Sequence, residues 1–361
     1  MSLRVAVIGA GAFGRNHLRV YRELEGAPPG NDSVALAAFV EPNPELRQRS
    51  AEQYGVPAFA SVNDLLAAKL QLDAASVCVP TVHHASVASQ LLRAGLDVLI
   101  EKPFAATLAE ADAVLQLAAS LKRIVQIGHL ERFNPAVTAA VSRLNQPMFF
   151  EAHRLSIFTP RSLDVDVVLD LMIHDLDIVL TFANSPVREV RAVGLPVLSR
   201  KVDIANVRVE FDSGCVANFT ASRVSTEQVR KLRFFQPHEY LSLDFARQEL
   251  IAIQVDPALL AQQLGGTSGL SSRPEAARSE AGVERPAALH PDATHPSRGL
   301  TLTKLDPPRA EPLRLEIEDF LSSVRSRRPP RVTAAAGRAA LALALEINVQ
   351  IAGHAHRAGL A

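Results

Sequence analysis

A glycine-rich turn between a short apolar strand and a helix constrains this chain more than any other feature. The stretch VIGAGAFG places Gly9, Gly11 and Gly14 in the spacing G-x-G-x-x-G, directly after the apolar run RVAVIGA. A helical pattern that contains Leu18 and Val20 follows it. In that context the spacing predicts a dinucleotide-binding turn, whose glycines allow the tight bend, the approach of a pyrophosphate and close packing of helix on strand. A plain tight turn is the alternative interpretation.

A carboxylate ends the second apolar run, VALAAFVE. At that place Glu41 can accept hydrogen bonds from the adenosine ribose hydroxyls, and its charge repels a 2′-phosphate. The next residues, Pro42 and Asn43, provide no arginine for such a phosphate. The sequence therefore favours NAD over NADP, although a merely solvated glutamate is the alternative. The cofactor contacts predicted in this half are Gly9, Gly11, Ala12, Phe13, Gly14 and Glu41.

The first third of the chain alternates apolar strands with helical patterns. The strand-like runs lie at 4–10, 34–41, 74–80, 97–103 and 124–129. Continuous apolar strands that alternate with helices indicate a parallel sheet covered on both faces. The fold class predicted for residues 1–128 is therefore α/β, a doubly wound Rossmann domain that binds NAD.

Longer strands follow from residue 129 onward. They lie at 148–158, 187–198, 204–224 and 231–250, and DSG at 212–214 predicts a hairpin turn. Residues 262–299 are rich in Gly, Ser and Pro and predict a flexible insertion. Two helices, at 311–326 and 333–351, close the chain. We expect residues 129–361 to form an α+β domain with a large open, mainly antiparallel sheet that serves substrate binding and oligomerisation.

Composition excludes several classes of protein. Lys+Arg and Asp+Glu both number 38, so no basic field favours nucleic acid. No uncharged apolar run reaches about 18 residues, and the N-terminus lacks a signal-peptide pattern, so no membrane association is expected. Cys78 and Cys215 lie in apolar runs, which is typical of free thiols in a reducing compartment. We expect a cytoplasmic protein.

Three polar residues, Glu101, Lys102 and Pro103, end the buried run VLI at 98–100. Ligands of open parallel sheets bind at the carboxyl ends of strands. Because Pro103 fixes one backbone angle, it can hold Lys102 in one direction. An ammonium group there can stabilise a developing alkoxide, and a partly desolvated lysine can also exchange protons. A surface Glu–Lys pair is the alternative.

A second polar group interrupts the apolar segment DVVLDLMIHDLDIVL at 166–180, which we expect to be a buried helix. Asp170, His174 and Asp177 are spaced by four and three residues, so they share one face. His174 is the natural acid or base near neutral pH, and either aspartate could orient its ring. An internal polar network is the alternative. The two aspartates are about 10 Å apart along the axis, so no metal site is predicted.

Together these stretches resemble the glucose-fructose oxidoreductase/inositol dehydrogenase family, the Gfo/Idh/MocA type. The resemblance rests on GAGAFGRNH, VPTVHHASVASQLLRAGLDVLIEKPFA and DLMIHDLDIV, and it covers nearly the whole chain outside 262–299. It implies a Rossmann domain plus a second domain whose open sheet makes a homodimer or homotetramer. It also implies Lys102 as the catalytic lysine and His174 as the acid/base histidine, with Asp170 beside it.

The same resemblance implies further cofactor contacts. Pro80, Thr81 and His84 would line the nicotinamide side, Glu101 would bind the nicotinamide ribose, and Lys102 would also contact the cofactor. One departure is Met172, which stands where the family often has glycine.

Within the family, GHLERFNPAV at 128–137 and LMIHDLDIV are most similar to bacterial sugar-nucleotide dehydrogenases. This implies oxidation of the 3-hydroxyl of UDP-N-acetylglucosamine ahead of transamination for lipid A, with a downstream aminotransferase as a partner. The candidate substrate contacts are Lys102, Arg132, Asn134, Arg154, Arg161, Asp170 and His174. Oxidation of another sugar or a cyclitol, a non-catalytic NAD-binding regulator, and a reductase of the biliverdin-reductase type are the alternatives. A regulator needs neither Lys102 nor His174, and such a reductase does not need the Asp170/His174 pair.

Overall fold

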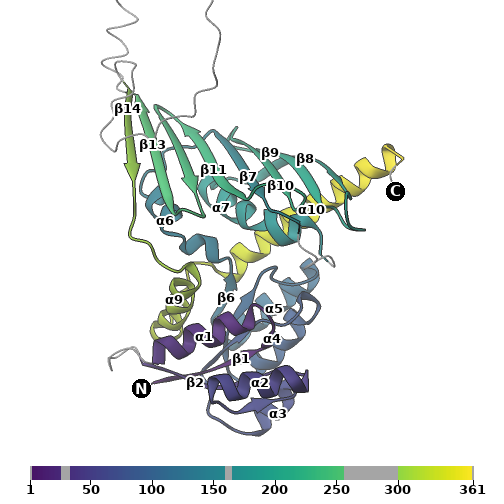
Figure 1. The fold of residues 1–361 in the computed structure, drawn as a ribbon, viewed down its shortest axis with the longest axis vertical. Coiled ribbons are helices and arrows are strands. Elements are labelled where there is room, and N and C mark those ends of the chain that lie inside the picture. Colours follow the sequence, from purple (N-terminus) through teal and green to yellow (C-terminus); the bar gives the residue numbers. More distant parts are fainter. Residues whose placement is uncertain (1, 26–32, 159–164, 256–299, 360–361) are drawn as a thin grey trace, which may run out of the picture.

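The computed structural model describes residues 2–25, 33–158, 165–255 and 300–359. Two sheets lie one above the other, the N-terminal sheet at the bottom of Figure 1 and the second sheet at the top. The predicted insertion at 262–299 and the candidate residue Arg161 fall outside the described residues.

The N-terminal sheet is parallel, with the strand order β3-β2-β1-β4-β5-β6. Its strands are β1 Leu3–Ile8, β2 Val34–Val40, β3 Ala58–Phe59, β4 Ala74–Val77, β5 Asp97–Glu101 and β6 Val125–Gly128. The helices α1 Gly14–Glu25, α2 Pro44–Tyr54, α3 Val62–Ala67, α4 His84–Arg93 and α5 Leu108–Leu121 connect them. The Rossmann prediction is confirmed. Within this sheet the sequence did not predict β3, which has two residues, too few to give a periodic signal.

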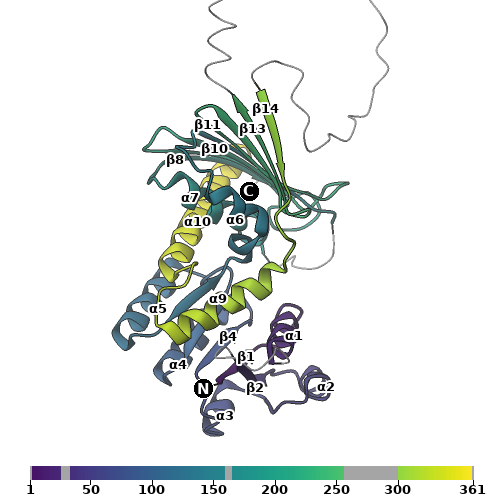
Figure 2. The same ribbon diagram turned by 90° about the vertical axis from the view of Figure 1, so that its left-hand side faces the viewer.

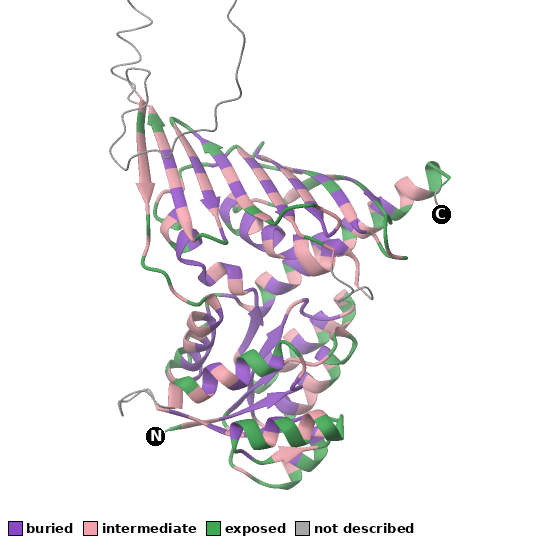
Figure 3. Cartoon of the chain, viewed as in Figure 1, coloured by how far each residue is buried: buried purple, intermediate pink, exposed green. Residues whose placement is uncertain are grey.

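Side-chain caps fix the first residues of two of these helices. Asn43 caps α2 by accepting a hydrogen bond from Leu46, and Thr107 and Glu110 form a capping box at the start of α5. All five residues of β5 are buried, as expected for a strand covered on both faces. Figure 3 shows this pattern, with buried strands and exposed outer faces on α2.

The second sheet has eight strands in the order β14-β13-β12-β11-β7-β10-β9-β8. They are β7 Phe149–Leu155, β8 Val187–Leu195, β9 Ile204–Phe211, β10 Val216–Ser222, β11 Val229–Gln236, β12 Glu239–Asp244, β13 Glu249–Val255 and β14 Leu300–Leu305. All neighbouring pairs are antiparallel except β7 and β10. The hairpin predicted at 212–214 joins β9 and β10. The segment 231–250 is a meander of β11, β12 and the start of β13, because two turns interrupt it.

One face of this sheet is covered and the other is open (Figure 2). Burial alternates along β7, and its buried residues Phe150 and Ala152 share a core with α6 Pro135–Val141, α7 Ile173–Ala183 and α10 Ala334–Arg357. The predicted open sheet is therefore present.

The chain returns to the first sheet after completing the second. The helix α9 Pro312–Ser326 buries an apolar stripe in the core formed by β1, β2 and α1; the stripe consists of Leu313, Ile317, Phe320, Leu321 and Val324. The helix α10 joins two other cores: Leu341 lies in the core on the other face of the N-terminal sheet, with Ala75 and Val98, and Ile347 lies in the core of the second sheet. The helices α9 and the start of α10 therefore pack on the N-terminal unit, although they follow the second sheet in the chain. By length and composition α10 could cross a membrane, but its buried residues make it a core helix.

The segment expected as one regular helix at 166–180 also differs. It begins with a π-helical turn at Val168–Met172 and becomes α-helical in α7. A pattern based on 3.6 residues per turn cannot distinguish the two.

Candidate active site

The three glycines of the first turn perform three separate tasks. Gly9 has φ +96°, and a Cβ on it would lie 2.7 Å from the carbonyl oxygen of Cys78. A Cβ on Gly14 would lie 1.9 Å from the carbonyl oxygen of Gly9, so only glycine lets α1 pack this closely. A Cβ on Gly11 would meet nothing within 4 Å. Gly11 therefore borders open space, which fits the approach of a pyrophosphate to the backbone.

Glu41 is held at the end of β2 by two main-chain donors. Ala10 N donates to Oε2 at 2.9 Å and Asn43 N donates to Oε1 at 3.0 Å. The carboxylate borders a cavity of about 540 Å³ that also reaches Gly9 and Gly11. A carboxylate has about four lone-pair sites, so capacity remains for ribose hydroxyls.

One arginine near Glu41 was missed in the sequence. Arg47 Nη1 donates to the main-chain oxygens of Glu41 at 2.7 Å and Pro42 at 3.0 Å. The residues directly after Glu41 provide no arginine, but the fold brings Arg47 close to it, with its guanidinium engaged by the backbone. Arg47 lies one turn into α2, and nothing in the sequence alone indicates that this position is close to Glu41.

A second cavity, of about 400 Å³, adjoins the first along the end of β4. It is lined by Phe13, Cys78, Val79, Pro80, Thr81, Val82, His84, Glu101, Lys102 and Val165. Cys78, Val79 and Pro80 border both cavities, so the two form one elongated site. That shape fits the two halves of a dinucleotide, and the predicted nicotinamide-side residues all lie in the second half. Burial, then the charge of Glu101, raises the pKa of the Cys78 thiol well above its ordinary value.

His84 and His17 fix the walls of this second cavity. His84 is buried and its two ring nitrogens lie 2.8 Å from the main-chain oxygens of Pro103 and Val79, which ties β5 to β4. His17 Nε2 hydrogen-bonds Glu101 Oε1 at 2.9 Å, and both side chains are buried. His17 was missed, although it is the last residue of GAGAFGRNH. It fixes the carboxylate of Glu101 beside Lys102.

The Lys102 ammonium reaches across to the π-helical turn. Its Nζ donates to the main-chain oxygen of Asp170 at 2.7 Å and lies 3.4 Å from Oδ1 of the same residue. The Lys102 side chain is 18% exposed, so it is partly desolvated. Lys102 and Asp170, predicted from stretches 68 residues apart, are therefore brought into contact.

His174 follows one turn later, with its Nδ1 buried and without a hydrogen-bond partner among the described residues. Burial, then the positive charge of Lys102, lowers the pKa of His174 well below its ordinary value. The imidazole is therefore neutral near pH 7 and can act as a base. In the described part of the chain neither aspartate hydrogen-bonds its ring: Asp170 contacts Lys102, and Asp177 lies beside Arg132, with Nε and Oδ2 3.7 Å apart.

Two of the candidate substrate contacts are internal and need correction. Arg154 is 4% exposed and donates to both carboxylate oxygens of Asp175 and to Glu131. Asn134 caps α6, and its amide donates to Glu131 and to the main-chain oxygen of Phe245. Both side chains thus have their hydrogen bonds satisfied inside the protein, which argues against direct contact with substrate.

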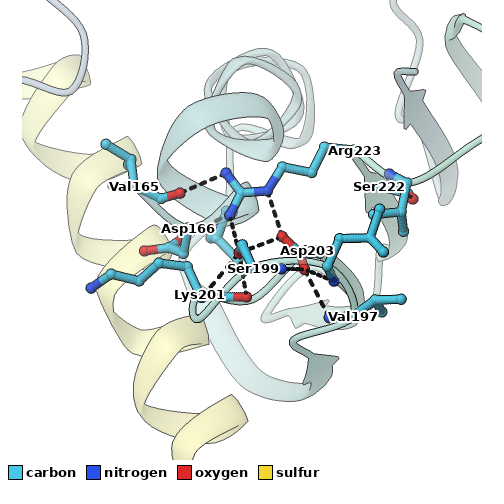
Figure 4. A network of polar contacts seen from close by, with 11 residues as sticks. Val165, Asp166, Val197, Ser199, Lys201, Asp203, Ser222 and Arg223 are labelled. Carbon is cyan, nitrogen blue, oxygen red and sulfur yellow. Dashed lines mark hydrogen bonds and ion pairs between the residues drawn. The ribbon is translucent and has the colours of Figure 1, made fainter. Parts of the chain in front are cut away.

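A polar network anchors the start of the π-helical turn (Figure 4). Arg223 Nη1 donates to the main-chain oxygen of Val165 at 2.8 Å, and its Nε pairs with Asp203 at 2.7 Å. Asp203 also accepts from the main-chain nitrogens of Val197 and Ser199. Because Val165 borders the nicotinamide-side cavity, this network holds one wall of the site in place.

Family models match both parts of the chain. The oxidoreductase family with an NAD-binding Rossmann fold matches residues 3–129, and the Gfo/Idh/MocA C-terminal domain matches residues 125–235.

Comparisons with individual proteins agree with these family matches. The chain is 34% identical over 350 residues, 97% of both proteins, to UDP-N-acetylglucosamine 3-dehydrogenase of Acidithiobacillus ferrooxidans. A solved structure of that enzyme has a TM-score of 0.80 with 33% identity and covers 97% of this chain and 98% of its own. An inositol 2-dehydrogenase of Leifsonia xyli is 33% identical over 196 residues, 52% of this chain and 56% of its own.

A more distant structure, an oxidoreductase of Agrobacterium radiobacter in complex with NAD+, L-tartaric acid and magnesium, has a TM-score of 0.77 at 14% identity. It covers 98% of this chain and 97% of its own, and its similarity shows the fold. With the glycine turn, Glu41 and the Lys102 strand end in place, these matches show that the chain belongs to the Gfo/Idh/MocA family and is an NAD-dependent oxidoreductase that acts on a CH–OH group.

Proposed function

We propose that this enzyme oxidises a secondary hydroxyl of a sugar nucleotide, namely the 3-hydroxyl of UDP-N-acetylglucosamine, with NAD as the acceptor. The observation that carries the chemistry is the contact of Lys102 with the π-helical turn beside a neutral His174, at the edge of the nicotinamide-side cavity. The choice of substrate rests on the relative that matches 97% of the chain.

Each residue has a separate task in this reaction. His174, kept neutral by burial and by Lys102, takes the hydroxyl proton. The Lys102 ammonium stabilises the negative charge that develops on the oxygen. Asp170 fixes the ammonium through its main-chain oxygen, and His17 fixes Glu101 where a ribose would bind. Bound NAD supplies the hydride acceptor. The product is a ketone.

The test is to incubate the protein with NAD and UDP-N-acetylglucosamine and to follow NADH together with a product lighter by two hydrogen atoms. A carbonyl trap or an aminotransferase is included, because ketone formation can be unfavourable. Lys102→Met is the matched control for background reduction. Turnover of a cyclitol but not of the sugar nucleotide would refute this substrate and favour an inositol-like reaction, which the Leifsonia xyli relative makes the second candidate.

We also propose a homo-oligomer in which a second copy covers the open face of the eight-stranded sheet. Apolar side chains on that face are exposed: Val193 is 43%, Leu195 41% and Phe235 39% exposed. Light scattering on the wild type and on a Leu195→Glu variant tests this, since a charge in a buried contact should produce monomers. A cytoplasmic location and an aminotransferase that acts next in lipid A synthesis are further parts of this proposal.

A further inference from the structure

A group of buried polar side chains lies behind His174. His129, which directly follows β6, is 1% exposed. In the described part of the chain neither of its ring nitrogens has a hydrogen-bond partner, and the same holds for His174 Nδ1, Asp177 Oδ2 and Arg132 Nη1. Polar atoms that are buried without partners are costly, and ordered water usually satisfies them. Their concentration beside one another indicates a small hydrated site.

The rings of His129 and His174 are neighbours. They meet edge to face, with centroids 6.4 Å apart and planes at 87°. Ring nitrogens lie only about 1 Å from a centroid, so nitrogens of the two rings are at least about 4 Å apart, too far for a direct hydrogen bond, and proton transfer between them needs a bridging water. Burial lowers the pKa of His129, against the attraction of Asp177. A neutral ring has one donor and one acceptor nitrogen, which is what a proton relay requires.

Asp177 and Arg132 lie close enough to His129 for their charges to act on its ring. Asp177 Oδ2 lies 3.7 Å from Arg132 Nε. Arg132 borders a cavity of about 360 Å³, which is also lined by Val137, Thr138, Val141, Thr181, Phe182 and Arg331. None of these residues borders the cofactor cavities. These polar side chains therefore extend from His174 away from the cofactor cavities.

Oxidation of an alcohol releases a proton as well as a hydride, and His174 must lose that proton before the next turnover. Bound cofactor and substrate would cover the Lys102 side of the site. We propose that His129 relays this proton from His174, through buried water and past Asp177, to the cavity beside Arg132. The inference rests on the proposed alcohol oxidation. When one nitrogen of His174 takes the hydroxyl proton, its Nδ1 proton passes by way of water to one nitrogen of His129, and the other nitrogen of His129 releases its proton. Apart from the hydride taken by NAD, no electrons are transferred.

The test compares wild type with His129→Phe, which keeps an aromatic ring but cannot carry protons. We expect kcat to fall at least about tenfold and KM for NAD to stay unchanged. In His129→Ala, which leaves space for a small base, imidazole added to the buffer should restore part of the rate. The solvent deuterium isotope effect on kcat should rise, because proton release becomes rate-limiting. His356→Phe, at an exposed histidine of α10, is the control and should show neither change.

Two results would overturn the relay. The first is an unchanged kcat and isotope effect in His129→Phe. The second is a loss of rate that leaves the isotope effect unchanged and that imidazole does not restore in His129→Ala, which would show a packing role.

The assay uses whichever of UDP-N-acetylglucosamine, a cyclitol or a free sugar the wild type oxidises. The test of the relay therefore does not depend on whether the proposed substrate is correct. A second readout needs no turnover. Nitrogen NMR of the labelled histidines should show a changed tautomer or pKa of His174 in His129→Phe, and no change would refute the coupling. The other charged or titratable groups that act on His129 are Glu101, Lys102, Arg132 and Asp177, and all remain in the variant.

Discussion

Replacing Glu316 by glutamine should stabilise the protein increasingly as pH rises. Glu316 lies on α9 with no exposed surface, and neither carboxylate oxygen has a hydrogen-bond partner among the residues described. Burial, then the charge of Glu101, raises the pKa of Glu316 well above its ordinary value. The folded carboxyl thus holds its proton at a pH at which the unfolded carboxyl has lost it. The contribution of this carboxyl to the free energy of unfolding is therefore fully present below the unfolded pKa of about 4.3. It is lost as pH rises toward the folded pKa.

The size of the effect follows from this window. While the folded carboxyl stays protonated, each pH unit above about 4.3 costs about 1.4 kcal/mol of the free energy of unfolding. Glutamine has similar size and never ionises, so Glu316→Gln removes the cost. The expected gain is nearly zero at about pH 4.5 and grows by about 1.4 kcal/mol with each further pH unit for as long as the folded carboxyl keeps its proton.

Urea unfolding measures this gain at a series of pH values and at one protein concentration. The chain has no tryptophan, so circular dichroism of the helices is the suitable signal. Glu318→Gln is the matched control on the same helix, because its side chain is 42% exposed and pairs with Arg314. That change should stay within about 0.5 kcal/mol at every pH. A Glu316→Gln effect of equal size at all pH values would refute the buried neutral acid.

Three further predictions concern the site. Glu41→Ala should weaken NAD binding and narrow its advantage over NADP, as measured by the two dissociation constants; a wild-type preference for NADP would refute the ribose assignment. Lys102→Met should lower kcat by roughly 10²–10⁴ with little change in NAD affinity, and near-normal turnover would contradict its role. Gly11→Ala should fold with wild-type thermal stability yet bind NAD weakly, whereas Gly14→Ala should lose stability because its Cβ would lie 1.9 Å from the Gly9 oxygen. Equal melting temperatures for these two variants would refute the argument.

The parts of the site that the sequence predicted are those with local signals. The turn at Gly9, the carboxylate at the end of β2 and the polar end of β5 each follow a short apolar run, and the rule that ligands bind at strand ends places them together. The contact of Lys102 with Asp170 agrees with this reasoning.

The errors lie where tertiary packing decides. Arg154 looked like an anion-binding residue, but its carboxylate partners, Asp175 and Glu131, can be identified only once β7 and α7 pack together. His129 has no periodic or spacing signal of its own. The π-helical turn was not predicted for a different reason. One extra residue in a helical turn leaves the hydrophobic pattern almost unchanged.

The return of α9 to the first sheet has a consequence for synthesis on the ribosome. The amide of Gln126 in β6 donates to the main-chain oxygen of Glu316, 190 residues later in the chain. The apolar face formed by Val5, Leu18 and Tyr21 therefore stays bare until almost the whole chain has been made. Contacts this distant slow folding and leave apolar surface open to aggregation. The cofactor-binding half, although contiguous in sequence up to β6, should therefore not be obtainable as a stable fragment without its last two helices.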